Sequence, residues 1–127
     1  MNSKRVLVID DEDGVRDIIH ITLEVVAGWD VFTATGGKEG IAIAQTQQPD
    51  AILLDVMMPE MDGLTTFQHL QADPQTQHIP TIFLTAKARM SEQQQYTHLG
   101  AVGVITKPFE ATRLIEQLQQ LLNWTTP

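Results

Sequence analysis

Short apolar segments alternate along the chain with longer segments in which apolar residues recur every three or four positions. Arg5 to Ile9 is an apolar, β-branched run, typical of a buried strand, and it stops at four consecutive acids, Asp10 to Asp13. From Val15 to Val26 the apolar residues have the spacing of one helix face, and Gly28 follows as a stop signal. The N-terminal part therefore predicts a strand, an acidic turn and an amphipathic helix.

The same alternation continues to the last helix. Further strands are expected at residues 29–34, 50–54, 80–84 and 101–105, and further helices from Gly36-Gly37, after Gly63, around Ser91 and over the apolar positions of residues 114–122. Ser91 and Gln94 have capping-box spacing, but Tyr96 and Leu99 are the only strong apolar residues of that helix, so we expect it to be loosely held. Strands alternating with helices predict an α/β fold, a doubly wound five-stranded parallel sheet with helices on both faces.

Composition and charge narrow the class of protein. A chain of 127 residues is the size of a single domain. With 16 acidic and 8 basic residues its formal charge is -8, which argues against direct binding of nucleic acid, since that requires clustered Lys and Arg. It has no cysteine, so disulfides and thiolate metal sites are excluded. No apolar run approaches the roughly 20 residues of a membrane span, so a cytoplasmic protein is expected.

Polar side chains stand where the expected strands end. Asp10 and Asp11 follow the first strand, Asp55 the third, Thr85 the fourth and Lys107 the fifth. Parallel strands end on the same side of a sheet, and the crevice beyond these ends is where ligands bind in open α/β sheets. We therefore expect the five side chains to converge.

The expected cluster has a definite chemistry. Three carboxylates repel one another and call for a cation, and all-oxygen ligation suits Mg²⁺, with Mn²⁺ as the second choice. A lysine and a threonine supply positive charge and a hydrogen-bond donor for a transferring phosphoryl group, and an aspartate can accept that group covalently. The residues alone thus predict a metal-assisted phosphoryl acceptor.

Four segments also resemble one family, the response-regulator receiver domains of two-component signalling. The resembling segments are Val8 to Glu12, with the acidic pair, Leu54 to Gly63, with the phosphoacceptor signature, Leu84 to Ala86, with the switch position, and Lys107 to Phe109, with the lysine loop. The resemblance covers nearly the whole chain. It implies a flavodoxin-like strand order 2-1-3-4-5 and a single receiver domain over residues 1–127, with a core of about residues 4–122 and a short C-terminal tail.

The resemblance also implies roles for the clustered residues. Asp55 would be the phosphorylated residue. Asp11, Asp55 and the backbone carbonyl of Met57 would bind Mg²⁺, with Asp10 assisting mainly through metal-bound water. Thr85 and Lys107 would hold the phosphoryl oxygens.

Further implications concern the loop after Lys107 and residues that tune the response. The bond between Lys107 and Pro108 would be cis. The family pairs its switch threonine with an aromatic residue three positions before the lysine, but Val104 stands there in this chain. Met57 and Lys87 occupy the positions that tune loss of the phosphate, and neither side chain is suited to assist hydrolysis.

The implied partners are a phosphodonor and a downstream target. A histidine kinase or a histidine phosphotransfer protein would supply the phosphoryl group, and an unknown downstream protein would bind the face made by the fourth helix, fifth strand and fifth helix. A monomer or weak homodimer is expected, acting as a stand-alone receiver or as part of a longer regulator.

Two other classes of function fit the residues less well. A Mg²⁺-dependent aspartyl-phosphate enzyme, a phosphatase or phosphotransferase, would in its commonest family need a second Asp two residues after the nucleophile, where this chain has Met57. We therefore expect a domain that catalyses its own phosphorylation and dephosphorylation, not a turnover enzyme. A nucleotide or flavin binder would want a Gly-rich or hydroxyl-rich phosphate loop after the first strand, whereas Asp10 to Asp13 would repel a phosphate.

Overall fold

Five parallel strands form one sheet in the order β2-β1-β3-β4-β5, as expected. The computed structural model describes residues 3–86 and 89–124. The strands are β1 Arg5–Ile9, β2 Asp30–Ala34, β3 Ala51–Asp55, β4 Thr81–Thr85 and β5 Gly103–Thr106. Register pairs Leu7 with Phe32 on one side and with Ile52 on the other. Central β3 is buried along its whole length, as the apolar run before Asp55 indicated.

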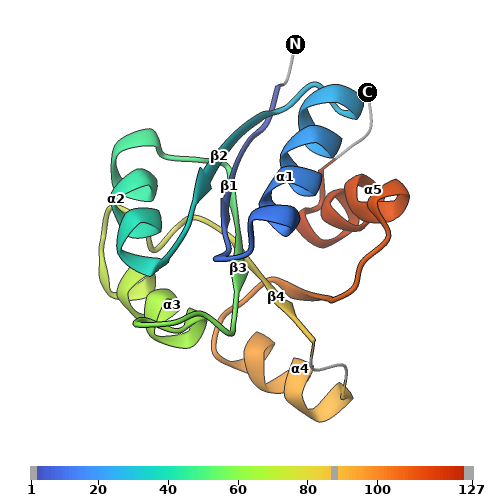
Figure 1. Ribbon diagram of the computed structural model, residues 1–127. Coiled ribbons are helices and arrows are strands. Elements are labelled where there is room, and N and C mark those ends of the chain that lie inside the picture. Colours follow the sequence, from blue (N-terminus) through green and yellow to red (C-terminus); the bar gives the residue numbers. More distant parts are fainter. Residues whose placement is uncertain (1–2, 87–88, 125–127) are drawn as a thin grey trace.

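Helices cover both faces of the sheet (Figure 1). They are α1 Asp13–Ile21, the π-helical segment η1 Thr22–Val26, α2 Gly37–Gln47, α3 Gly63–Ala72, α4 Met90–His98 and α5 Ala111–Leu122. Side chains of α1, η1 and α5 pack on one face, and side chains of α2, α3 and α4 pack on the other. Among the helices of residues 3–86 and 89–124, none has the length and apolar character of a membrane span.

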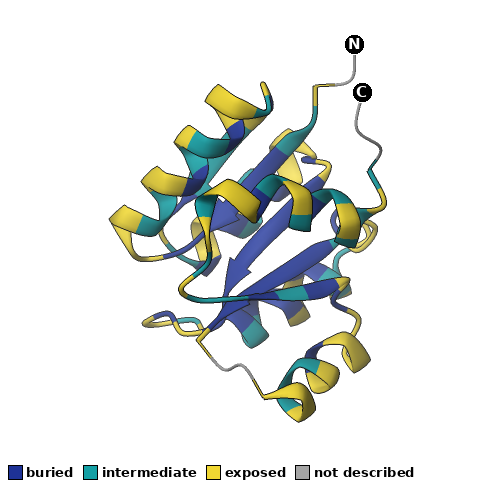
Figure 2. Ribbon diagram, turned by 90° about the vertical axis from the view of Figure 1, so that its right-hand side faces the viewer, coloured by how far each residue is buried: buried dark blue, intermediate teal, exposed yellow. Residues whose placement is uncertain are grey.

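Two hydrophobic cores lie on opposite faces of the sheet, because alternate residues of a strand point to opposite sides. Val6 and Val8 belong to the core under α1 and α5, while Leu7 and Ile9 belong to the core under α2 and α3. In Figure 2 the strands are mostly buried and α4 is mostly exposed. Tyr96 is the one buried residue of α4, and Leu99, the other strong apolar residue expected in this helix, is exposed. That the helix is loosely held stays a prediction.

Several expected boundaries shift by one or two residues. The third strand spans residues 51–55 instead of 50–54, so Asp55 is its last residue and not the first of the following turn. The capping box at Ser91 and Gln94 is wrong: the extended residue before α4 is Arg89, and Ser91 already lies inside the helix. The first helix changes to π-helical hydrogen bonding at Thr22, which apolar spacing alone did not reveal.

Candidate functional site

The three expected carboxylates meet at the C-terminal edge of the sheet. Asp10 follows β1 and is fully buried, Asp55 ends β3 and is 3% exposed, and Asp11 is exposed. One carboxylate oxygen of each lies within 4.8 Å of the others. The backbone N–H of Asp10 donates to the carbonyl of Ala34 over 3.1 Å, which extends the β1–β2 ladder by one bond and fixes this aspartate at the strand end.

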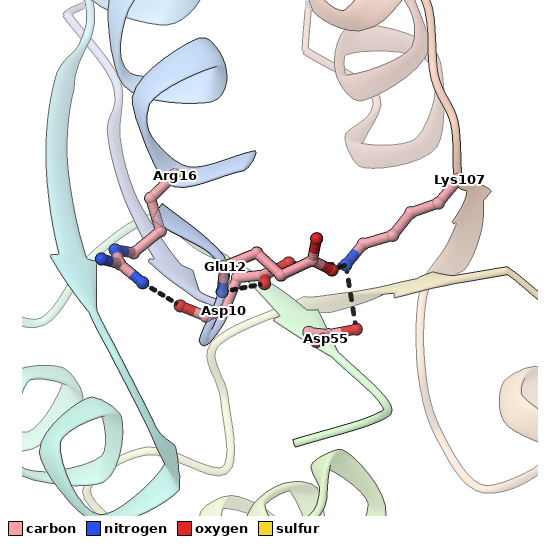
Figure 3. A network of polar contacts seen from close by, with 5 residues as sticks. All are labelled: Asp10, Glu12, Arg16, Asp55 and Lys107. Atoms are coloured by element: carbon pink, nitrogen blue, oxygen red, sulfur yellow. Dashed lines mark hydrogen bonds and ion pairs between the residues drawn. The ribbon is translucent and has the colours of Figure 1, made fainter. Parts of the chain in front are cut away.

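Lys107 reaches this cluster from the end of β5 (Figure 3). Its Nζ lies 2.8 Å from Oδ2 of Asp10, 3.2 Å from Oδ1 of Asp55 and 3.3 Å from Oε1 of Glu12. The Lys107 backbone N–H donates to the carbonyl of Thr85 over 2.8 Å, and the Lys107–Pro108 peptide bond is cis, as expected. The ammonium therefore approaches the acids from a loop tied to the neighbouring strand end.

Two residues, Glu12 and Arg16, make contacts at this edge that were not expected from the sequence. Glu12 was part of the acidic segment, but the structure also gives it the contact with Lys107, and its backbone N–H donates to Oδ1 of Asp10 over 2.9 Å. Arg16 donates from Nη1 to the carbonyl of Asp10 over 2.7 Å (Figure 3). It also pairs with the carboxylate of Asp13. The only sequence signal for Arg16 was its position one helical turn after the acidic run.

Burial and charge set the protonation of the site. Burial, followed by the neighbouring charge of Asp10, raises the pKa of Asp55 to about 6, although Lys107 and the N–H of Met57 oppose the rise. Burial lowers the pKa of Lys107, but hydrogen bonds to Asp10 and Asp55 and their negative charges outweigh burial and raise it overall. Lys107 is therefore a fixed positive charge near neutral pH.

The donor set fits a hard divalent cation. Asp10, Asp11 and Asp55 offer oxygen ligands only, and two of the three are buried where an uncompensated charge is costly. The single ammonium of Lys107 contacts Asp10, Asp55 and Glu12, and Asp11 adds a fourth carboxylate, so negative charge remains in excess. The exposed Asp11 leaves one side of the cluster open to solvent. These residues could hold a metal ion that keeps some of its water.

The structure places three of the four remaining predicted residues. Thr85 is the buried last residue of β4, which pairs with β3 through Asp55 and Leu84. Val104 is half-buried in β5 and packs against the core that contains Tyr96. Met57 has an exposed side chain, and its backbone N–H opposes the rise in the pKa of the Asp55 carboxylate. Lys87, the second predicted tuning residue, lies outside the described residues.

Comparison with known proteins gives consistent matches. Residues 6–119 match the family described as response regulator receiver domain. The chain is 40% identical over 121 residues to the DNA-binding dual master transcriptional regulator RpaA of Synechocystis sp., covering 95% of this chain and 50% of that protein. It is 36% identical over 127 residues to the phosphate regulon transcriptional regulatory protein PhoB of Pseudomonas aeruginosa, covering 100% and 55%.

Solved structures extend the similarity to the whole fold. The chemotaxis response regulator CheY4 of Vibrio cholerae aligns with a TM-score of 0.87 and 32% identity, over 94% of this chain and 99% of that chain. The chain spans about half the length of the first curated relatives it matches, 50% of one and 51% of another.

Proposed function

The chain belongs to the response regulator receiver domain family, and from this premise we propose that Asp55 is the residue that accepts its phosphoryl group. The family makes it a phosphorylation-controlled signalling module of two-component systems. The observation that supports Asp55 is its position: a buried carboxylate at a strand end, within 4.8 Å of two further carboxylates and 3.2 Å from Lys107.

The transfer is a substitution at phosphorus. A carboxylate oxygen of Asp55 attacks the phosphorus of a phosphohistidine, the new P–O bond forms, the P–N bond breaks, and the imidazole leaves with the electron pair. Bound Mg²⁺, or Mn²⁺, would neutralise charge on the phosphoryl oxygens. Asp10, Asp11, Asp55 and the Met57 carbonyl would hold it, with Asp10 acting mainly through water.

Lys107 and Thr85 would stabilise the phosphorylated form. The ammonium of Lys107 already lies 3.2 Å from Oδ1 of Asp55, so a phosphoryl oxygen on that carboxylate comes within its reach. The Thr85 hydroxyl would donate to another phosphoryl oxygen, and its movement would carry the start of α4 with it. We propose that the α4, β5 and α5 face then binds a downstream protein.

The chain is better suited to signalling than to the catalytic turnover of a substrate. Receiver domains act as signalling modules, and the residue two positions after Asp55 is Met57, whose thioether cannot exchange a proton at neutral pH. We propose that the domain catalyses its own phosphorylation and slow dephosphorylation. We propose that Met57, at the rim of the site, and Lys87, two positions after Thr85 in the sequence, set these rates.

The donor is proposed to be a histidine kinase or a histidine phosphotransfer protein, in keeping with the family. The name of one relative describes a DNA-binding regulator, but that protein is about twice as long, and this chain carries a formal charge of -8. We therefore assign no direct contact with nucleic acid to residues 1–127. We propose that these residues form one receiver domain with a core of about residues 4–122. A cytoplasmic monomer or weak homodimer fits this role.

Intact mass after incubation with Mg²⁺ and acetyl phosphate tests the proposal. The wild type should gain one phosphoryl group, and Asp55→Asn should gain none. Asp30→Asn is the matched control, because it removes the same charge from an exposed position at the start of β2 and should leave the gain intact. Phosphoryl uptake by Asp55→Asn, or none by the wild type with any small phosphodonor, would contradict the assignment.

A further inference from the structure

The sulfur chemistry of this chain is confined to methionine, since it contains five methionines and no cysteine. Their exposure differs sharply among the described residues. Met57 and Met90 are 70% and 71% exposed, whereas Met58 is 8% exposed. Thioether oxidation follows exposure, so among the methionines that the structure describes an oxidant reaches Met57 and Met90 most readily. Of these two, Met57 lies two positions from Asp55.

The backbone fixes Met57 at the mouth of the acidic site. Met57 lies two positions after Asp55, and its backbone N–H is near enough to the Asp55 carboxylate to oppose the rise in that group's pKa. The preceding residue, Val56, donates to the carbonyl of Leu84 over 3.1 Å and accepts from the N–H of Gly63 over 2.9 Å. The next residue, Met58, packs into the core. With its neighbours held in this way, the Met57 thioether stays in solvent beside the site.

We infer that Met57 is a site of oxidation by peroxides and that its sulfoxide shortens the lifetime of the phosphoryl group on Asp55. The inference rests on the proposed function of Asp55. In the oxidation step the sulfur lone pair attacks one peroxide oxygen, the S–O bond forms and the O–O bond breaks. The second oxygen leaves, after protonation, as water or an alcohol. The sulfur loses two electrons and the peroxide gains them.

The consequence for hydrolysis comes from hydrogen bonding. A thioether is a weak acceptor, so the Met57 side chain cannot hold the water that must attack phosphorus opposite the P–O bond. A sulfoxide is polar and its oxygen accepts hydrogen bonds well, so it can orient a water at the same rim. Oxidation adds no net charge, and metal binding by the carboxylates should therefore be unchanged. The modification acts on phosphate loss alone.

The experiment compares wild type, Met57→Leu and Met90→Leu before and after treatment with hydrogen peroxide. Peptide mass locates the added oxygen. Each protein is then phosphorylated with acetyl phosphate and Mg²⁺, the donor is removed, and decay of the phosphorylated mass is followed. We expect phosphate loss from oxidised wild type and oxidised Met90→Leu to be about two- to tenfold faster than from the untreated proteins, the effect of one added hydrogen bond. Oxidation should leave Met57→Leu unchanged.

Three results would overturn the inference. Decay of oxidised wild type could be unchanged or slower, Met57→Leu could accelerate as much as wild type, or the affinity for Mg²⁺ could fall on oxidation and so account for the change. A different result bears on the premise: if untreated wild type takes up no phosphoryl group, the proposed function of Asp55 fails, and the inference fails with it. Uptake followed by oxidation-insensitive decay refutes the role of Met57 alone.

Discussion

Lys107 donates a hydrogen bond of 2.8 Å to Asp10 although 97 positions separate the two residues in the chain. The same ammonium contacts Asp55 and Glu12, so it balances part of the negative charge of the acidic cluster. A bound Mg²⁺ and the Lys107 ammonium would therefore compete for the same carboxylate oxygens.

Lys107→Ala should bind Mg²⁺ more tightly than wild type at pH 8, where the carboxylates are ionised. A unit charge about 5 Å from a divalent ion costs on the order of 1 to 2 kcal/mol of binding at near-aqueous dielectric, which is about a five- to thirtyfold change in Kd. Calorimetric titration measures it. Arg113→Ala, which removes an exposed charge on α5, is the control and should not change the affinity. Weaker binding by Lys107→Ala would show that the lysine organises the ligands instead.

Asp55→Asn should stabilise the protein in EDTA at pH 7.5 but hardly at pH 3.5. The folded pKa of Asp55 is about 6, against an ordinary 3.8, so between these values the folded state binds more protons than the unfolded state. The contribution of Asp55 to the free energy of unfolding is therefore fully present below pH 3.8. It falls as the pH rises to about 6 and stays low at higher pH. Urea unfolding should show a gain on the order of 1 to 3 kcal/mol at the higher pH. An equal difference in unfolding free energy between Asp55→Asn and wild type at both pH values would contradict the raised pKa of Asp55.

Gly63→Ala should both destabilise the fold and reduce phosphoryl uptake. A Cβ at this position would lie 2.2 Å from the backbone oxygen of Asp55 and 2.7 Å from the Cα of Val56, and backbone atoms cannot yield without moving Asp55. Overpacking of this kind costs roughly 1 to 3 kcal/mol or more. Gly14→Ala, where a Cβ meets nothing within 4 Å, is the control and should leave thermal unfolding and uptake near wild type. A variant as stable and as reactive as wild type would refute the steric argument.

Phosphorylation should be detectable at Tyr96, the only tyrosine of the chain. Val104 cannot serve as an aromatic switch, whereas Tyr96 of α4 packs with its ring centre 5.1 Å from that of Phe83, two residues before Thr85. Sparsely packed elements are the ones that shift in switching, and α4 has one buried residue. Fluorine NMR of fluorotyrosine-labelled protein should show a single resonance that moves with a beryllofluoride adduct. A resonance that stays in place, while amides of α1 or α2 shift, would locate the response elsewhere.

Met57→Asn combined with Lys87→Glu should shorten the half-life of phosphorylated Asp55 severalfold. An amide can orient the attacking water where the thioether cannot, and effects of this kind are commonly worth about 1 kcal/mol. The change at Lys87 removes a positive charge near the switch threonine in sequence. Decay of phosphorylated protein in Mg²⁺ buffer is the measurement, with Met90→Asn as an equally exposed control. A half-life that does not fall would show that neither side chain governs the access of water.

The sequence determined the fold and the edge of the sheet at which Asp10, Asp55 and Lys107 meet. Apolar runs of strand length alternated with helical periodicity, and this pattern allows few topologies because parallel strands need right-handed crossovers. Strand ends then fall on one side of the sheet, so Asp10, Asp55 and Lys107 converge as expected. The errors of one or two residues in the expected strand boundaries did not affect this result, because a strand that ends one residue later still ends at the same edge of the sheet.

The tertiary structure alone decided the contacts and the exposure of individual side chains. The approach of Lys107 to Glu12 and of Arg16 to the Asp10 carbonyl depends on rotamers and loop paths that no local pattern encodes. Local pattern also failed at α4, whose start is set by the extended backbone of Arg89 and not by the capping box at Ser91. Met57 and Met58 are adjacent residues of the same type, yet Met57 is exposed and Met58 is buried. The hydrogen bonds between Val56 and Leu84 and between Val56 and Gly63 hold this loop in place, so contacts between distant parts of the chain decide which methionine is buried.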